Sequence, residues 1–229
     1  MIARNDLEHA RFNMIEQQIR PWDVLDLKIL DLLTVMRRED FVPVAHKALA
    51  FVDMQIPLLE PTDEAMQLGQ CMLEPKVEAR MLQDLQVMPQ EKVLEIGAGS
   101  GYMAALLAQR SQRVISLEIN PELARMARAN LQRAGINNAE VREADGAKGL
   151  PAEGPFDVIV LSGSVAEVPP ALLSQLRVGG RLAAIVGMEP MMRANFITRT
   201  SDTAYTTSQP WDTMAARLAN FAEPSRFHF

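Results

Sequence analysis

The chain has 229 residues, of which 48% are hydrophobic and 23% are charged, and its formal net charge is -6 at pH 7. This length and composition are typical of one globular domain, or of one domain with a small appendage, that needs no disulfide or metal to be stable. The acidic balance argues against a general nucleic-acid binder, because phosphate contacts need clustered Lys and Arg side chains.

Cysteine, histidine and apolar residues give no sign of cross-links, metals or membrane spans. Cys71 is the only cysteine, which excludes an intramolecular disulfide and favours a reducing compartment, so a cytoplasmic protein is expected. His9, His46 and His228 lie far apart and near no cysteine, so no metal site is predicted. No run of 18 or more apolar residues is present, and the polar, acidic N-terminus lacks the apolar core of a signal peptide.

Two regions of the chain differ in their predicted secondary structure. Residues 1–76 are expected to form a helical segment and an active-site loop that cover the active site of an α/β core, residues 77–229, in one compact unit. Apolar spacing predicts one amphipathic helix between Leu7 and Ile19. A second helix is predicted to begin at Asp23, as its N-cap, and to run through Leu33.

The stretch before the α/β core is rich in proline. Residues 51–76 contain Pro57, Pro61 and Pro75 and are expected to be irregular. An amphipathic helix is predicted to begin at Pro75, because proline suits a first helical turn and apolar residues follow at helical spacing.

From residue 92 onwards, strand and helix patterns alternate. Strands are predicted over 92–96, 114–118, 140–144, 156–161 and 181–186, and helices over 100–109, 121–133 and 170–176. Such alternation implies parallel strands, right-handed crossovers and helices on both faces of the sheet. A turn at Gly179-Gly180 should lead into the strand over 181–186. Residues 196–200 and 204–207 predict an antiparallel hairpin that closes one edge. The expected fold is therefore an α/β, doubly wound, Rossmann-like sheet.

A glycine-rich turn follows the first of these strands. Its sequence is Glu95-Ile96-Gly97-Ala98-Gly99-Ser100-Gly101. The glycines allow the backbone to approach a ligand closely, and the helix that follows offers free N–H groups and a positive dipole end. A dinucleotide fingerprint would need its third glycine at the position of Tyr102. A pyrophosphate would be repelled by Glu95, whereas the ammonium and sulfonium of S-adenosylmethionine (SAM) would not.

Acidic residues also end the next two predicted strands. Glu118 lies about 20 residues beyond the turn, where a carboxylate can bind both ribose hydroxyls. Asp145, before Gly146, is placed to meet an adenine edge, although an Asp before Gly is as readily a turn former. Three acidic strand ends in this order predict a SAM site. Its residues are expected to be Glu95, Gly97, Ala98, Gly99, Gly101, Glu118, Ile119, Asp145 and Gly146.

These motifs resemble the protein-L-isoaspartate O-methyltransferase family. Leu94–Tyr102 is similar to the family's SAM motif, and Arg38–Pro43 to its helical N-terminal signature. Phe156–Val160 and Val178–Leu182 are similar to its later strands, so the resemblance covers roughly residues 10–187. It implies a SAM-dependent methyltransferase in protein repair, with S-adenosyl-L-homocysteine as product and a carboxylate on a protein or peptide as acceptor.

The sequence departs from the family before the SAM motif. The family carries Gly-Gln-Thr-Ile-Ser-x-Pro, whose Ser hydroxyl lies beside the isoaspartyl carboxylate. Here the stretch is Gly69-Gln70-Cys71-Met72-Leu73-Glu74-Pro75. The resemblance implies that Gln70 and Met72 lie near the cofactor and that Leu73 takes the Ser position. Because Leu offers no hydrogen bond, we expect SAM binding to persist and isoaspartyl methylation to be weak or absent.

Two further departures leave the acceptor open. The family's Ala-Pro-rich loop is replaced by Ser162–Pro169, and Trp211–Phe229 does not match the family's closing strand. The alternatives are methyl transfer to another small molecule or peptide, or a SAM-binding protein that has lost catalysis. A nicotinamide dehydrogenase is disfavoured by Tyr102. Cys71, with no histidine near it in sequence, is expected to be an apolar filler rather than a nucleophile.

Overall fold

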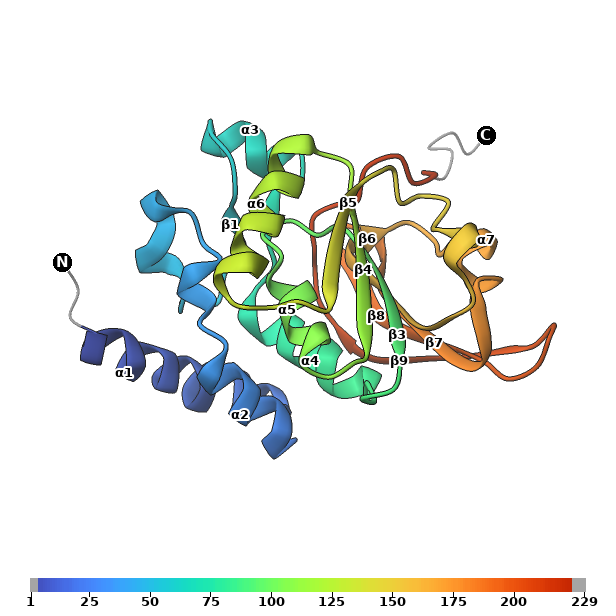
Figure 1. Cartoon of the computed structure of the whole chain (residues 1–229), viewed down its shortest axis with the longest axis horizontal. Coiled ribbons are helices and arrows are strands. Elements are labelled where there is room, and N and C mark those ends of the chain that lie inside the picture. Colours follow the sequence, from blue (N-terminus) through green and yellow to red (C-terminus); the bar gives the residue numbers. More distant parts are fainter. Residues whose placement is uncertain (1–3, 224–229) are drawn as a thin grey trace.

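A twisted sheet of seven strands forms the centre of the computed structural model, which describes residues 4–223 (Figure 1). The strands are β3 (Lys92–Ile96), β4 (Arg113–Glu118), β5 (Ala139–Glu143), β6 (Phe156–Val165), β7 (Leu176–Met188), β8 (Met191–Arg199) and β9 (Tyr205–Asp212). Their order is β5-β4-β3-β6-β7-β8-β9, and the strands from β5 to β7 are parallel. The chain moves from β3 outward to β5 and then returns to the other side of β3. This reversal confirms the predicted doubly wound sheet.

Helices cover both faces of the sheet, as predicted. They are α4 (Pro75–Leu85), α5 (Tyr102–Ala108), α6 (Pro121–Arg133) and α7 (Pro170–Leu173). Figure 1 shows α4, α5 and α6 on one side of the sheet and α7 on the other. Strand side chains alternate between these faces, so Val93 belongs to the apolar cluster that contains residues of α4, α5 and α6. Leu94 belongs to the cluster that contains Leu172 of α7.

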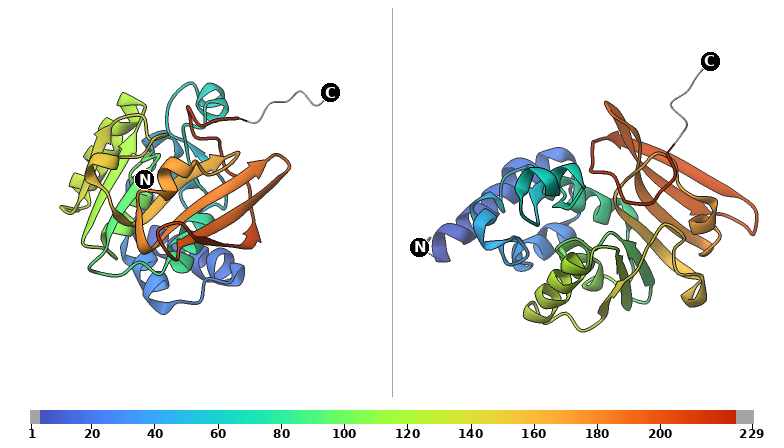
Figure 2. Two further views of the ribbon diagram at one scale, coloured as in Figure 1. Left: turned by 90° about the vertical axis from the view of Figure 1, so that its right-hand side faces the viewer. Right: turned by 90° about the horizontal axis from the view of Figure 1, so that it is seen from above.

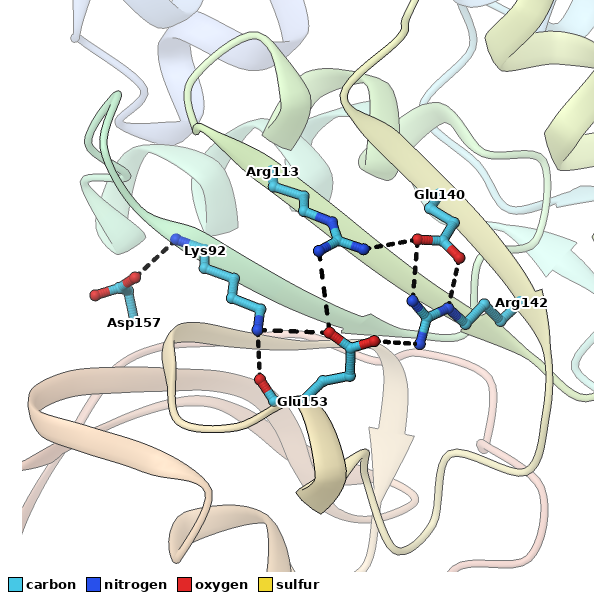
Figure 3. A network of polar contacts seen from close by, with 6 residues as sticks. All are labelled: Lys92, Arg113, Glu140, Arg142, Glu153 and Asp157. Carbon is cyan, nitrogen blue, oxygen red and sulfur yellow. Dashed lines mark hydrogen bonds and ion pairs between the residues drawn. The ribbon is translucent and has the colours of Figure 1, made fainter.

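The face of the sheet that α7 covers carries much less helix than the face that α4, α5 and α6 cover. A crossover loop with a short 3₁₀ turn, Pro151–Glu153, covers it in place of a long helix. Figure 3 shows how Glu153 ties this loop to the sheet, since its carboxylate meets Arg142 of β5 at 2.9 Å and Lys92 of β3 at 3.7 Å. Arg142 also binds Glu140, which in turn binds Arg113 of β4. These pairs fasten three neighbouring strands to the crossover loop.

The N-terminal helices differ in detail from the prediction. Helix α1 (Arg4–Met14) continues into one π-helical turn, Ile15–Ile19, and α2 is Leu27–Val35. The N-cap of α2 is Asp26, whose carboxylate accepts the N–H of Lys28 at 2.8 Å, so the assignment to Asp23 was wrong. Asp23 instead ends the preceding 3₁₀ turn in a left-handed conformation, with φ of 67°.

Residues 51–76 are largely irregular, as predicted, but they also contain short helices and strands. Strand β1 (Ile56–Pro57) pairs antiparallel with β2 (Cys71–Met72), and α3 (Thr62–Gln67) connects them. Two-residue strands show no alternation and α3 buries only Ala65, so apolar periodicity could not reveal these elements. The small hairpin brings residues 68–71 beside the sheet.

The hairpin at the end of the chain is longer than predicted. Apart from Thr200 and Ala204, the segments 196–200 and 204–207 lie inside β8 and β9, and the turn predicted at Gly179-Gly180 lies within β7. The predicted helix over 170–176 ends at Leu173, because Leu176 already pairs with Phe156 of β6. Figure 2 shows the orange and red strands at the end of the sheet away from yellow-green β5, which confirms that the hairpin closes one edge.

A tryptophan pair joins the N-terminal segment to the last strand of the sheet. The rings of Trp22 and Trp211 meet edge to face, with centroids 5.0 Å apart, and the Arg80 guanidinium lies 5.7 Å from both ring centroids. The indole N–H of Trp211 donates to the Asp84 carboxylate at 2.8 Å. The N-terminal segment is thereby fixed to α4 and to the last strand of the sheet.

Candidate active site

A cavity of about 200 Å³ lies beyond the carboxyl ends of β3, β4 and β5, beside the point where the strand order reverses. Ligands of doubly wound folds bind in this place. The lining residues come from three regions. They are Leu68, Gly69, Gln70 and Cys71; the strand ends and turns with Ile96, Gly97, Gly99, Leu117, Glu118, Ile119, Asn120, Leu123, Ala144, Asp145, Gly146 and Ser162; and Arg217, Leu218, Ala219 and Phe221.

Most of the predicted cofactor residues meet at this cavity. Gln70, Gly97, Gly99, Glu118, Ile119, Asp145 and Gly146 line it, whereas Met72, Leu73, Glu95, Ala98 and Gly101 do not. The N-terminal helices were expected to cover the site. Within residues 4–223, only the stretch 68–71 of that segment lines the cavity, while α2 packs against α4.

The glycine-rich turn takes the strained conformation that its glycines allow. Gly97, Gly99 and Gly101 have φ of 92°, 53° and 83°, in the left-handed region that side chains rarely adopt. A Cβ on Gly101 would lie 3.2 Å from the backbone of Ala127, so this glycine also permits close packing of α5 on α6. The Gly97 N–H donates to Leu117 O at 2.8 Å, which ties the turn to β4.

Glu118 organises the floor of the cavity. Its carboxylate accepts the Gly99 N–H at 2.8 Å and the Asn120 N–H at 3.0 Å, and the residue is only 5% exposed. Burial raises the pKa of this carboxyl above its ordinary value. A carboxylate has about four acceptor positions, so these backbone bonds still leave capacity for a ligand's hydroxyl.

Glu95 lies beneath the cavity rather than beside it. It is fully buried, and its carboxyl accepts the hydroxyls of Ser116 at 2.6 Å and Ser162 at 2.8 Å. Burial raises its pKa to about 8. Because Ser162 lines the cavity, any influence of Glu95 on a ligand would pass through that hydroxyl.

The position of the family Ser points into the protein core. Leu73 is 5% exposed and Met72 is 3% exposed, and both belong to the larger apolar cluster. The carbonyl of Leu73 accepts a hydrogen bond from the buried Arg38 guanidinium at 2.6 Å. From this part of the chain, residues 68–71 line the cavity instead, including Gln70 and Cys71.

Cys71 lines the cavity but is poorly suited to act as a nucleophile. Its thiol donates to the Gln55 side-chain oxygen at 3.2 Å, and burial, together with nearby Glu74 and Glu78, raises its pKa to about 12. At pH 8 the thiolate fraction is then on the order of a thousandfold below that of an ordinary cysteine. We expect iodoacetamide to alkylate Cys71 correspondingly slowly in the folded protein. Alkylation at the rate measured in urea would contradict this pKa.

The segment of residues 215–221, here called the closing segment, crosses the cavity and was missed by the sequence analysis. The Ser164 N–H donates to Ala216 O at 2.8 Å, and the Leu218 N–H donates back to Ser164 O at 2.9 Å. At the other side, the Asn220 amide donates to the Asp145 carboxylate at 2.9 Å. Gly97 is one indirect sign of this segment in the sequence, because a Cβ at that position would lie 2.8 Å from the Leu218 side chain.

Two kinds of feature are absent from the described part of the chain. Residues 4–223 contain no group of three or more His, Cys, Asp or Glu side chains arranged to hold a metal ion; His228 lies outside this range. No helix among these residues is long and apolar enough to cross a membrane.

Comparison with known proteins identifies the family. A sequence model described as protein-L-isoaspartate(D-aspartate) O-methyltransferase matches residues 10–214. A protein-L-isoaspartate O-methyltransferase of Koribacter versatilis is 38% identical over 193 residues, which are 84% of this chain and 82% of that protein. One from Methanoculleus marisnigri is 40% identical over 177 residues, or 77% of each chain.

Solved structures show the same fold. A protein-L-isoaspartate O-methyltransferase superposes with a TM-score of 0.76 at 23% identity, covering 92% of this chain and 66% of its own. A putative one from Plasmodium falciparum, in complex with S-adenosyl-L-homocysteine, gives 0.70 at 18% identity, covering 91% and 96%. The sequence matches extend over most of the chain, which therefore belongs to the protein-L-isoaspartate(D-aspartate) O-methyltransferase family and is a SAM-dependent methyltransferase.

Proposed function

We propose that the chain binds SAM in the cavity at the carboxyl ends of β3, β4 and β5 and transfers its methyl group to the carboxylate of an isoaspartyl residue in a protein or peptide. The family match over residues 10–214 carries this proposal. The relatives from Koribacter and Methanoculleus bear the name of this activity. A cytoplasmic location is part of the proposal, because the single cysteine favours a reducing compartment.

The order of polar groups along the sheet edge supports one orientation of the cofactor. Asp145 follows β5, Glu118 ends β4, and the glycine-rich turn follows β3. Adenine, ribose and the amino acid end would then meet these three groups in turn, as the sequence analysis expects. The sulfonium would lie near β3 with its methyl group toward Ser162 of β6. Gln70 and Cys71 would form the wall of the site nearest the methyl group.

The chemistry needs orientation more than acid–base catalysis. A carboxylate has a reference pKa of about 4 and is already a nucleophile at neutral pH. Its oxygen attacks the methyl carbon, the carbon–sulfur bond breaks, and S-adenosyl-L-homocysteine leaves with the electron pair on sulfur. Aligning the two reactants can supply on the order of 7–11 kcal/mol of the barrier.

The sequence alone predicts weak or absent isoaspartyl methylation because Leu73 replaces the family Ser, whereas the position of Leu73 supports a site that works without this hydroxyl. Because Leu73 packs in the core, its apolar side chain does not form part of the cavity wall. Placing a Ser there would remove core packing and bury a hydroxyl, at a cost of a few kcal/mol in stability. We therefore expect no gain of activity from Leu73→Ser.

The test is the initial rate of methyl transfer to an isoaspartyl peptide, with the matched aspartyl peptide as control. The native chain should methylate only the isoaspartyl peptide. An inactive native chain beside an active Leu73→Ser variant would contradict the proposal and would make the missing hydroxyl the cause. Activity on neither peptide, with SAM still bound, would point to another acceptor or to a binding protein without catalysis.

A further inference from the structure

The cavity has charges of opposite sign at its two ends. Glu118 and Asp145 provide carboxylates at the β4 and β5 side. Among the described residues that line the cavity, Arg217 of the closing segment is the only Lys or Arg. An acceptor carboxylate would be repelled by Glu118 and Asp145 and attracted by Arg217, so the charges favour its entry from the side of Arg217.

The Arg217 side chain is fixed at the strand ends where the acceptor must approach. Its Nη1 lies 3.3 Å from the Ser164 hydroxyl at the end of β6, and its Nη2 donates to Gly187 O at the end of β7 at 3.0 Å. If the cofactor extends from β5 to β3, its methyl group faces β6. The guanidinium then stands on the far side of the methyl group from the sulfur, where an in-line nucleophile belongs.

The guanidinium already holds a carboxylate of the protein itself. Its Nε lies 2.8 Å from the Glu223 carboxylate, and the two side chains are 29% and 49% exposed. Exposed ion pairs contribute little to stability. A substrate carboxylate can therefore replace Glu223 on Arg217 at small cost, whereas the bonds to Ser164 and Gly187 keep the guanidinium in place.

We propose that Arg217 binds the carboxylate of the methyl acceptor, with Glu223 occupying that position until the substrate arrives. Planar guanidinium groups bind carboxylates with two parallel hydrogen bonds, which fixes the orientation of the oxygens. The arginine supplies the donor that Leu73 lacks. It lies beyond the residues 10–214 that match the family. This inference rests on the proposed function, because it assumes a carboxylate acceptor.

The experiment measures two affinities for each variant by calorimetry. The first is that of the protein for S-adenosyl-L-homocysteine, and the second is that of the product-loaded protein for the isoaspartyl peptide. Losing a charged hydrogen-bond partner should raise the peptide Kd of Arg217→Gln about tenfold or more and leave the product Kd within about twofold. Arg217→Lys should recover part of the peptide affinity. Glu223→Gln should bind the peptide more tightly than the native chain, because the competing carboxylate is gone.

Arg177→Gln is the matched control. Arg177 is half-exposed and pairs with Asp157 near the amino end of β7, so its loss changes the net charge equally but far from the cavity. Its peptide Kd should stay native. If Arg217→Gln weakens product and peptide binding alike, or Glu223→Gln weakens peptide binding, Arg217 only fastens the closing segment and the inference is wrong.

The kinetics separate this inference from the function on which it rests. A native chain that methylates the isoaspartyl peptide, beside an Arg217→Gln variant with an unchanged KM for it, would overturn the role of Arg217 alone. A native chain that neither binds nor methylates the peptide would overturn both.

Discussion

Replacing Glu118 with alanine is expected to weaken SAM binding at least tenfold. The change removes the carboxylate proposed to accept the two ribose hydroxyls, and hydrogen bonds to a charged group are worth about 1.5–3 kcal/mol each. It also leaves the Gly99 N–H without its partner at 2.8 Å, so the glycine-rich turn loses an anchor to β4. Both effects act on the cofactor, and calorimetric titration with SAM measures their sum.

Glu122→Ala provides the control for this measurement. Glu122 is exposed in the first turn of α6, at the same end of the sheet, and does not line the cavity. The Glu122→Ala variant loses the same charge as Glu118→Ala and should bind SAM with native affinity. Equal affinities of the native chain and Glu118→Ala, with the fold intact by circular dichroism, would disprove the assignment of Glu118 to the ribose.

Replacing Arg38 with methionine is expected to destabilise the protein by about 3–5 kcal/mol, since one partner of a buried ion pair is removed. Arg38 is fully buried, and its guanidinium binds the Glu78 carboxylate, Leu73 O and Ala50 O. Its carbon Cζ also lies 5.1 Å from the centre of the Tyr102 ring. The substitution leaves the Glu78 carboxyl buried without its cation, and chemical denaturation measures the loss.

The destabilisation should depend on pH. Burial raises the pKa of Glu78 to about 7, while Arg38 acts to lower it. A carboxyl with a raised pKa in the folded state binds its proton more tightly there than in the unfolded chain. Its contribution to stability is therefore present at low pH and is lost as the pH rises through that pKa.

Removing Arg38 raises this pKa further, so the deficit of Arg38→Met should be smaller at pH 5 than at pH 8. The double variant Arg38→Met, Glu78→Gln should recover much of the loss at pH 8, because no charge is then left buried. A deficit that is the same at both pH values and in the double variant would show that packing, rather than the unpaired carboxylate, governs the effect.

The features that could be predicted well from the sequence are those determined by residues close together in the chain. The apolar run of β3, the glycines of the turn and the acidic residue that ends β4 each act locally, so the parallel core and the place of Glu118 followed from their order. Asp23 misled because an Asp can cap a helix or end a turn, and here Asp23 ends the 3₁₀ turn while Asp26 caps α2. Local pattern does not resolve that choice.

The parts that sequence did not predict depend on contacts between distant residues. Glu95 is separated from the cavity by Ser162, which a linear motif does not show. The closing segment has no apolar periodicity, and it is held by hydrogen bonds to Ser164 and Asp145, which are far away in the sequence. Leu73 aligns with a family Ser, but its side chain belongs to the core, and the distant Arg38 binds its carbonyl.

The edge-to-face contact between Trp22 and Trp211 has a consequence for synthesis of the chain on the ribosome. The N-terminal helices emerge first, yet one of their contacts is with β9, which is translated almost last. Until then the face of Trp22 that packs on Trp211 has no native partner. Contacts between such distant positions slow folding, and uncovered apolar surface favours aggregation in the meantime. This part of the N-terminal segment therefore reaches its native packing only after the last strand joins the sheet.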